Sequence, residues 1–244
     1  AGGLTAADLG VRVKIVTGEL AGVKEQFGAE LDRFVTWTQD GRIYIHEQTL
    51  RSLNREGGQE KLEEMLRHEL LAALEQRPVV IVPVGSVEQH GPHCPQDVDI
   101  SIPYHLAIRT AAGIDSFPVI VAPPLPYGFT HYNMGEVGTI TLRLEIFVEV
   151  LCDIARSIWN NGFHRIIMLN GHGGNEAPNW TASVKLAEED VWALAITYWN
   201  MATDELLAWS EADEGSIGHG GEWETSLQLH LRNGLVDMSL AVKD

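Results

Sequence analysis

The sequence predicts an α/β fold, a three-layer αβα sandwich with a mainly parallel central sheet. From residue 79 onward, short apolar runs alternate with segments of helical periodicity, which is typical of a parallel sheet with helices on both faces. Clusters of His, Asp and Glu follow two of these runs, at strand ends where α/β proteins bind ligands. With 244 residues, 45% hydrophobic and 21% charged, the chain is long enough to bury a sizeable core.

Residues 1–77 predict an N-terminal extension of strands plus a helix, packed on the core. Between residues 11 and 55, short apolar alternations are separated by Gly and Asp, which indicates strands or hairpins. The stretch Glu60–Glu75 indicates a helix, because its leucines and Met65 recur at helical spacing and Pro78 follows its end.

Residues 78–244 predict the main domain, in which strands and helices alternate. The expected strands are Val79–Val84, Val119–Ala122, Ile166–Leu169 and Val191–Thr197. Three expected helices run from Pro103 to Ala112, from Asn175 to Glu188, and from Glu222 to Asn233. A fourth ends at Asn161 and is indicated by the helical spacing of Phe147, Leu151, Ile154 and Ile158.

A first polar cluster, Glu88-Gln89-His90-Gly91-Pro92-His93 followed by Asp99, comes directly after the first expected core strand. Side chains two positions apart in extended backbone project to the same side, so Glu88 and His90 can reach one point. Such oxygen and nitrogen ligands suit Zn²⁺, Mn²⁺ or Fe²⁺ better than Ca²⁺. Taken alone, the cluster fits a polar loop equally well.

Two further segments have the same character. Asn170-Gly171-His172-Gly173-Gly174-Asn175 follows an expected strand, and residues 218–226 place His219, Glu222 and Glu224 beside paired glycines. Glycines allow the backbone to turn tightly and to approach a metal closely. Three such loops at strand ends and helix starts favour a shared metal site over surface decoration.

Together these segments resemble the creatininase family of metal-dependent amidohydrolases. The resemblance is carried by the Pro-Val-Gly-Ser-x-Glu-Gln-His-Gly-Pro-His run at 83–93, Asp99, and the boxes at 170–175 and 219–226. It spans about residues 78–240 and implies a creatininase-like αβα hydrolase domain. Family members commonly form hexamers, so the resemblance also implies a homo-oligomer.

The resemblance implies that Glu88, His90, Asp99 and His172 bind two divalent metal ions, Zn²⁺, Mn²⁺ or Fe²⁺, with Asp99 bridging them. A hydroxide held between the ions would be the nucleophile. Creatininase itself has a metal-binding glutamate two residues after the histidine of its second box, where this chain has Gly174. We therefore expect Glu222 to supply the missing carboxylate.

Other site residues follow from the same resemblance. His219 matches the family's catalytic histidine, which moves a proton between water and leaving group, although a core histidine bonded to backbone is the alternative. His93 and Glu224 are expected to orient ligands without binding metal. Cys94 is expected to be a small buried residue, and no disulfide is expected with Cys152.

The substrate is less well defined by the sequence. Tyr198 and Trp199 match a Tyr-Trp pair whose tryptophan contacts substrate in creatininase. His131 and Glu136 are further candidates, and a surface position is the alternative for both. Gly215 and Gly218 replace an aromatic and an acidic residue of creatininase, which argues against creatinine itself as the substrate.

The leading prediction is hydrolysis of a C–N bond in a small cyclic amide or formamide. The alternatives are hydrolytic ring opening of a cyclic polyol ketone such as a dehydro-inosose, and a non-catalytic metal-binding or assembly protein.

The net charge of −17 argues against nucleic acid and anionic membrane partners. No P-loop, Gly-x-Ser-x-Gly motif, long apolar stretch or signal-peptide pattern occurs, so we expect a cytoplasmic protein with a small-molecule substrate.

Overall fold

The computed structural model describes residues 70–71, 73–212 and 218–242, together with the backbone of three short strands before residue 47. The chain divides into two units, one of residues 1–78 with 110–120 and the other of residues 79–109 with 121–244. The packing of residues 1–77 on the core stays a prediction.

The first unit contains a three-stranded sheet in the order β1-β3-β2. Strands β1 (Val13–Val16) and β3 (Ile43–His46) run parallel, and β2 (Val35–Trp37) pairs with β3 in the antiparallel sense. The helix expected over Glu60–Glu75 lies mostly outside the described residues, but its last part, from Leu70, is helical.

The central sheet has four strands in the order β5-β4-β6-β7. Its strands are β4 (Val79–Val84), β5 (Val119–Val121), β6 (Ile166–Asn170) and β7 (Ala193–Thr197). The β4–β6 and β6–β7 pairs are parallel. The side chains of Val80, Ile81, Val82 and Val84 are all buried, so both faces of β4 are covered and the strand reads as a continuous apolar run.

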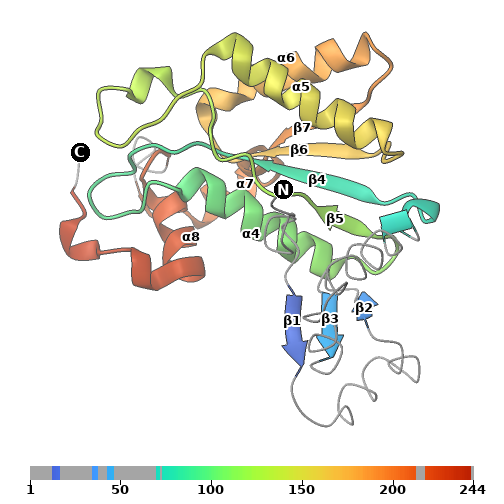
Figure 1. The fold of residues 1–244 in the computed structure, drawn as a ribbon. Coiled ribbons are helices and arrows are strands. Elements are labelled where there is room, and N and C mark those ends of the chain that lie inside the picture. Colours follow the sequence, from blue (N-terminus) through green and yellow to red (C-terminus); the bar gives the residue numbers. More distant parts are fainter. Residues whose placement is uncertain are drawn as a thin grey trace, which may run out of the picture. The chain divides into compact units, whose positions relative to one another are not determined.

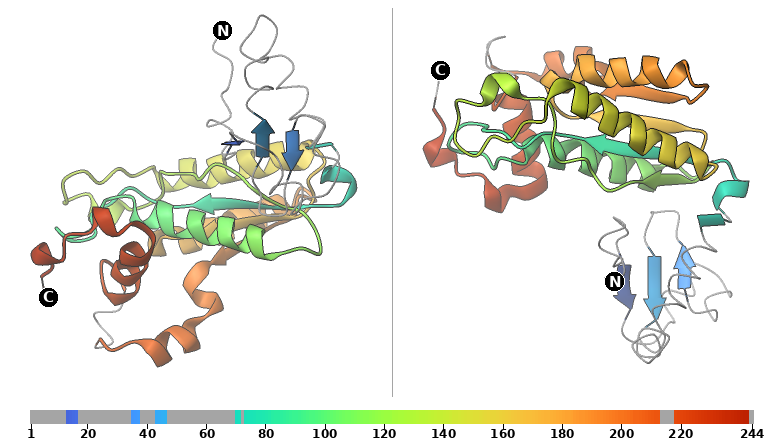
Figure 2. Two further views of the ribbon diagram at one scale, coloured as in Figure 1. Left: turned by 90° about the horizontal axis from the view of Figure 1, so that it is seen from below. Right: turned by 45° about the horizontal axis from the view of Figure 1, so that its top comes forward.

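Helices cover the two faces of this sheet. Helices α5 (Leu144–Asn160) and α6 (Glu176–Ala187) lie on one face, and α4 (Val98–Gly113) and α8 (Glu222–Arg232) lie on the other (Figure 1). A turned view shows the same three layers (Figure 2). The predicted αβα sandwich is therefore confirmed. None of the described helices combines the length and apolar composition needed to cross a membrane.

Two helices differ from the sequence prediction. Helix α7 (Thr203–Trp209) was not expected, because it has no buried residue and therefore no apolar stripe. Helix α4 begins at Val98, five residues before the predicted start at Pro103. The carbonyl of Asp97 accepts the N–H groups of Ile100 and Ser101 and so starts the helix early. Consequently Asp99 lies in its first turn.

Two glycines allow the start of α4 to lie against the strand ends. A Cβ at Gly85, directly after β4, would be 2.6 Å from the carbonyl oxygen of Asp99, and a Cβ at Gly171, directly after β6, would overlap that same oxygen. Only glycine permits this approach without a shift of backbone. The backbone of Asp99 is thereby held between the carboxyl ends of two neighbouring strands.

Candidate metal centre

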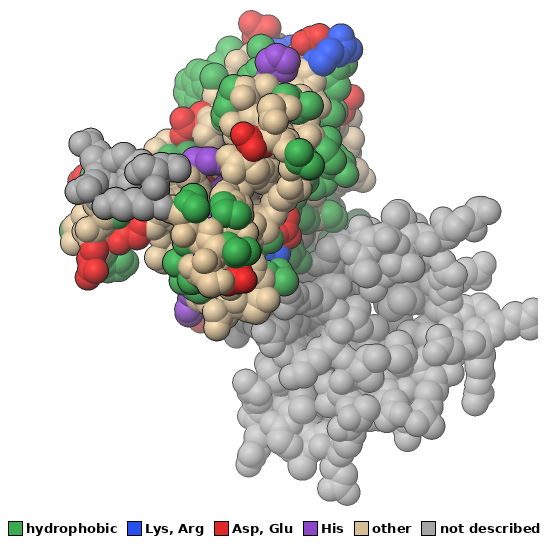
Figure 3. All heavy atoms as spheres, turned by 90° about the vertical axis from the view of Figure 1, so that its left-hand side faces the viewer, with side chains coloured by type: hydrophobic (Ala, Val, Ile, Leu, Met, Phe, Trp, Pro, Cys, Tyr) green, Lys and Arg blue, Asp and Glu red, His purple; other side chains and the backbone are tan. Residues whose placement is uncertain are grey.

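A pocket of about 460 Å³ lies at the carboxyl ends of the parallel strands, and it is lined by carboxylates, imidazoles and aromatic rings. None of the described residues that line it is a Lys or an Arg. Figure 3 views the molecule from the side toward which these strands run, and few Lys or Arg side chains appear on it. The position agrees with the rule that α/β sheets bind ligands beyond their carboxyl ends.

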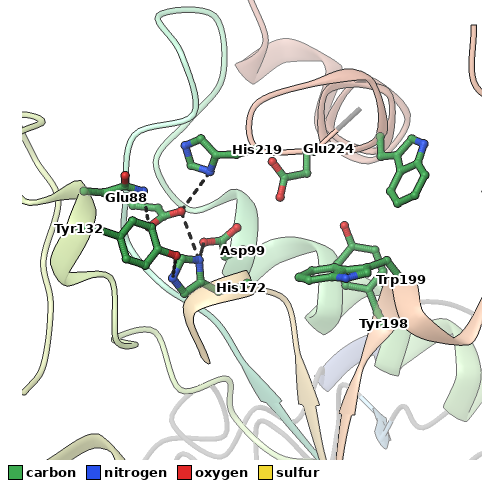
Figure 4. Close-up of a pocket in the computed structure, with 12 residues that line it drawn as sticks. Glu88, Asp99, Tyr132, His172, Tyr198, Trp199, His219 and Glu224 are labelled. Carbon is green, nitrogen blue, oxygen red and sulfur yellow. Dashed lines mark hydrogen bonds and ion pairs between the residues drawn. The ribbon is translucent and has the colours of Figure 1, made fainter. Parts of the chain in front are cut away.

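Five buried side chains, which we call the polar floor, converge beneath this pocket: Glu88, His90, Asp99, His172 and Glu224. Asp99 Oδ1 lies 3.0 Å from His90 Nε2, and Asp99 Oδ2 lies 3.1 Å from His172 Nδ1. Glu88 Oε1 lies 3.2 Å from His172 Nδ1, and Glu224 Oε2 lies 3.3 Å from His90 Nε2. Figure 4 shows Asp99 between His172 and Glu224.

Within the polar floor, two groups of ligand atoms share one residue, and a third group joins Glu88 and His90 to the exposed His219. Glu88, Asp99 and His172 form the first group, and His90, Asp99 and Glu224 form the second. The two oxygens of Asp99 are divided between the groups. A carboxylate placed in this way can bridge two cations.

Both histidines of the floor are held by a backbone carbonyl at one ring nitrogen. His90 Nδ1 lies 3.2 Å from the carbonyl oxygen of Glu88, and His172 Nε2 lies 3.2 Å from that of Phe129. A carbonyl can only accept, so these nitrogens carry the hydrogen. The remaining nitrogens, His90 Nε2 and His172 Nδ1, face the carboxylates. This is the arrangement of metal-binding histidines, whose second nitrogen donates to a carbonyl or carboxylate.

Four buried atoms contact only imidazole or carboxylate atoms of the site and have no further hydrogen-bond partner: Glu88 Oε1, His90 Nε2, Asp99 Oδ1 and Asp99 Oδ2. Carboxylates buried so close together are costly unless a cation compensates their charge. Burial by itself would lower the pKa of His172, but Asp99 and Glu88 outweigh it and raise this pKa to about 9. The carboxylates thus attract positive charge, and the donor set fits divalent cations.

Polar side chains fix the loops that carry the floor. The Asn170 amide accepts from the backbone N–H of His172 at 3.1 Å and donates to the His172 carbonyl at 2.7 Å. Asn175 accepts from the N–H of Phe129 at 2.8 Å and donates to the carbonyl of Gly85 at 3.0 Å. The two asparagines of the second box therefore connect β4, β6 and the loop after β5.

Glu88 is held from the same loop after β5. Its Oε2 accepts from Thr130 Oγ1, and from Asn133 Nδ2 at 3.0 Å. Burial by itself would raise the pKa of Glu88, but hydrogen bonds from His172, His219 and Thr130 outweigh it and lower this pKa. Glu88 is therefore ionised, with Oε2 occupied by the loop and Oε1 turned to the pocket.

The structure does not bring Glu222 to the polar floor, and places Glu224 there instead. The Glu222 carboxylate accepts from the backbone N–H groups of Glu211 at 2.9 Å and Ala212 at 3.4 Å. Glu224 Oε2 faces His90 and accepts from the Gly220 N–H at 2.7 Å. Residues two apart on a helix point in different directions, so only one of these glutamates can face the floor. The box predicts an acidic ligand but not which of its two glutamates provides it.

His219 lies at the edge of the floor. Its side chain is 42% exposed, and Nδ1 lies 3.2 Å from Glu88 Oε1. The other ring nitrogen lies 3.1 Å from Gln89 Nε2, and the N–H of Gly91 donates to Gln89 Oε1 at 2.8 Å. Nε2 is therefore held by Gln89, and Nδ1 is the ring nitrogen of His219 that faces the site.

The other predicted site residues divide into two sets. Tyr198 and Trp199 line the pocket, with ring centroids 4.9 Å apart. His93 is buried beside the floor, and its Nε2 lies 2.9 Å from the Thr225 hydroxyl. His131 and Glu136 are exposed and do not line the pocket. Cys94 and Cys152 are both free.

Three pocket residues were missed by the sequence analysis: Tyr132, Asn133 and Trp223. Tyr132 and Asn133 directly follow His131 in a short 3-10 helix (η2, His131–Asn133), where neighbouring side chains diverge. The loop was identified, but the wrong position in it was chosen. Trp223 lies between the two glutamates of the third box, and its indole N–H donates to Ser210 Oγ at 2.6 Å.

An αβα protein with buried carboxylates and imidazoles that share one aspartate at its strand ends has the features of a metal-dependent hydrolase. The chain belongs to the creatininase family: the model of this family, described as creatinine amidohydrolase, matches residues 63–244. The family and the hydrolase class expected from the three motifs are therefore confirmed.

Three relatives illustrate the range of the family. Creatinine amidohydrolase from Pseudomonas putida is 30% identical over 181 residues, which are 67% of this chain and 68% of that protein. A 3-dehydro-scyllo-inosose hydrolase from Thermotoga maritima is 34% identical over 110 residues, 45% of this chain and 34% of that protein. A mycofactocin precursor peptide peptidase from Mycolicibacterium smegmatis is 33% identical over 167 residues, 63% of this chain and 58% of that protein.

The chain spans less than two thirds of the last two relatives. Among solved structures, a creatininase variant described as the Zn–Zn type matches with a TM-score of 0.65 and 28% identity, over 74% of each chain. This likeness agrees with the αβα architecture described above.

Proposed function

We propose that this protein is a hydrolase that uses two divalent cations per subunit to cleave a C–N bond in a small cyclic amide or a formamide. The proposal rests on the position of Asp99. Its two carboxylate oxygens face two different groups of ligand atoms. Two-metal hydrolytic sites hold their ions roughly 3.5–4 Å apart, a separation that a bridging carboxylate can span.

The residues of the polar floor would hold the two ions. Glu88 and His172 would hold one ion, His90 and Glu224 would hold the other, and Asp99 would contribute to both. Oxygen and nitrogen ligands of this kind suit Zn²⁺, Mn²⁺ or Fe²⁺, and the Zn–Zn creatininase supports zinc. When bound, the cations supply an activated water as nucleophile and polarise the carbonyl group of the substrate.

His219 is the residue proposed to move the proton. It faces the pocket beside Glu88, and it is exposed enough to meet a substrate. As water adds to the carbonyl carbon, the water proton passes to His219 and the C=O electron pair moves to oxygen. When the C–N bond breaks, its electron pair stays on nitrogen, and His219 returns the proton there. The net reaction adds one water across the bond.

The pocket supports a small substrate with a flat or apolar body. Tyr198, Trp199 and Trp223 line it, and a volume of about 460 Å³ lies in the usual range for small-molecule sites. The pocket offers no Lys or Arg among its described lining residues to bind an anionic group. His131 and Glu136 lie outside this lining, so their proposed contact with substrate has no support from the pocket.

Ring opening of a cyclic polyol ketone is the second candidate. It is favoured by the relative whose name is 3-dehydro-scyllo-inosose hydrolase, at 34% identity. The same activated water would add to the ketone carbonyl, and a C–C bond would break in place of the C–N bond. A non-catalytic role is disfavoured by the complete set of carboxylates and imidazoles in the floor.

A substrate panel tests the proposal. Purified protein loaded with Zn²⁺ or Mn²⁺ is assayed against cyclic amides including creatinine, formamides, keto-inositols and short peptides. The proposal expects turnover of a cyclic amide or formamide that a chelator abolishes and added metal restores. Turnover of keto-inositols alone would establish the second candidate, and turnover of peptides alone would overturn both. Two bound ions without any turnover would favour the non-catalytic reading.

A further inference from the structure

Gly174 stands at the position where the resemblance to creatininase implies an additional metal-binding glutamate, and the Tyr132 hydroxyl lies directly beside it. A Cβ at Gly174 would lie 2.6 Å from both the Tyr132 hydroxyl oxygen and His172 Nε2, and it would overlap the carbonyl oxygen of Phe129. No side chain at position 174 is therefore compatible with Tyr132 in its present place. The absence of a side chain at 174 makes room for the Tyr132 hydroxyl.

The hydrogen-bond inventory of Tyr132 fixes the role of its hydroxyl. The oxygen lies 3.2 Å from His172 Nε2, the same nitrogen that lies 3.2 Å from the Phe129 carbonyl. Because that carbonyl can only accept, His172 Nε2 carries the hydrogen, and the Tyr132 oxygen accepts from it. The hydroxyl hydrogen of Tyr132 consequently cannot point at His172. It is free to donate elsewhere.

The Tyr132 side chain lies between the pocket and the polar floor. Tyr132 lines the pocket, its ring is 63% exposed, and its hydroxyl points toward His172 at the floor (Figure 4). Its ring stacks near that of His172, with centroids 6.1 Å apart and planes inclined by 20°. A phenol has an ordinary pKa of about 10, so the Tyr132 hydroxyl keeps its proton at neutral pH.

We propose that Tyr132 is a catalytic residue whose hydroxyl donates a hydrogen bond to the substrate oxygen that becomes negatively charged when water adds to the carbonyl. This inference rests on the proposed hydrolysis and adds to it a residue that acts on the oxygen, whereas His219 acts on the proton of the water. Tyr132 keeps its hydrogen throughout, so no bond to it forms or breaks. The effect of such a donor is larger in the transition state than in the bound substrate.

The test compares Tyr132→Phe with Tyr127→Phe on the best substrate of the panel. Tyr127 belongs to the same loop, is 42% exposed and does not line the pocket, so its variant is the matched control. Loss of one such donor is expected to lower kcat by about 100-fold. KM and bound metal should change little, a pattern that a purely structural role would not produce.

Gly174→Ala provides a second variant. Its methyl group is expected to displace the Tyr132 hydroxyl and, because it would also meet His172 Nε2 and the Phe129 carbonyl, to weaken metal binding, so kcat is compared at saturating metal. The double variant Gly174→Ala/Tyr132→Phe should be no slower than the slower single variant, because both remove the same donor.

The results that would overturn this inference are distinguishable from those that would overturn the proposed function. A metal-loaded wild type that hydrolyses nothing removes the proposed function, and the role of Tyr132 with it. An active wild type with an equally active Tyr132→Phe variant, or with a variant that has lost metal, overturns the role of Tyr132 alone. An additive loss in the double variant would also contradict it.

Discussion

The polar floor is buried and mostly held at several atoms, whereas the aromatic residues around the pocket range from the buried Tyr198 to the largely exposed Tyr132. We call these residues, Tyr132, Tyr198, Trp199 and Trp223, the aromatic rim. His90 and His172 are each fixed at both ring nitrogens, but Tyr132 is 63% exposed and contacts the floor through its hydroxyl. The floor comes from strand ends and adjoining helix starts, and three of the four rim residues come from short 3-10 segments. The contrast separates the residues that would hold the metal ions from the aromatic residues that line the pocket, among which Tyr132 is also proposed to act on the reacting oxygen.

Removal of the Asp99 carboxylate, which both ligand groups share, should abolish metal binding by the polar floor. In Asp99→Asn, both ligand groups lose their common charged member, so we expect loss of metal. Metal catalysis contributes several kcal/mol, and at 1.36 kcal/mol per tenfold this predicts a loss of at least about 1,000-fold in activity. Asp153→Asn is the control, because that carboxylate is 76% exposed on α5. Two ions retained in Asp99→Asn would contradict the shared role.

A substitution at His219 should impair proton transfer and leave metal binding unchanged. His219→Asn is expected to keep both ions and to lower kcat by about 100-fold or more, the usual contribution of a positioned acid–base group. His230→Asn is the matched control, because His230 is exposed on α8 and contacts Arg109. Metal content and kcat are measured on the same preparations. A lost ion in His219→Asn would instead make His219 a ligand.

A change in the rim should alter substrate binding and leave the floor intact. Trp199→Leu removes an aromatic surface from the pocket, so KM is expected to rise by about tenfold, which corresponds to roughly 1–1.5 kcal/mol. Bound metal should be unchanged. Trp192→Leu serves as control, because Trp192 is 63% exposed and does not line the pocket. Loss of metal in Trp199→Leu would show that floor and rim are not independent.

The pH dependence of stability should differ between the metal-free and metal-bound protein. The pKa of His172 is raised to about 9, so its contribution to stability is fully present below pH 6.5 and is lost as the pH rises toward 9. The metal-free protein should therefore lose a few degrees in Tm over this range. Bound metal requires neutral imidazoles, so the metal-bound protein should not show this loss.

Thermal unfolding at several pH values, with and without chelator, measures the difference. At acid pH the sign reverses, because the pKa of Glu88 is lowered and its contribution disappears as the pH falls below 4.5. A metal-free protein equally stable at pH 6.5 and pH 9 would contradict the assigned charge state of His172.

The floor could be predicted from the sequence because parallel strands end at one edge of a sheet. Glu88, His90 and His172 follow β4 and β6, so recognising the strands was enough to bring them together. Asp99 lies close to these three residues because Gly85 and Gly171 have no side chain, which leaves space for the first turn of α4 beside the strand ends. The fold followed from the same alternation of strands and helices.

The rim was predicted only in part: Tyr198 and Trp199 were expected to face substrate, whereas Tyr132 and Trp223 were not, for a geometric reason. Which side of a helix or turn faces the pocket depends on rotations of about 100° per residue, and an error of one or two positions changes the answer. Glu222 was chosen where Glu224 faces the floor, and His131 was chosen where Tyr132 faces the pocket. The sequence contains no signal that fixes these rotations without the packed core.

The most direct test of two cations shared by Asp99 is the metal content of the wild type and of two matched variants, Glu224→Gln and Glu222→Gln, determined by elemental analysis. Two ions per chain are expected in the wild type and in Glu222→Gln, and one fewer in Glu224→Gln. A wild type with a single ion, or a loss of metal in Glu222→Gln but not in Glu224→Gln, would contradict the arrangement of the floor.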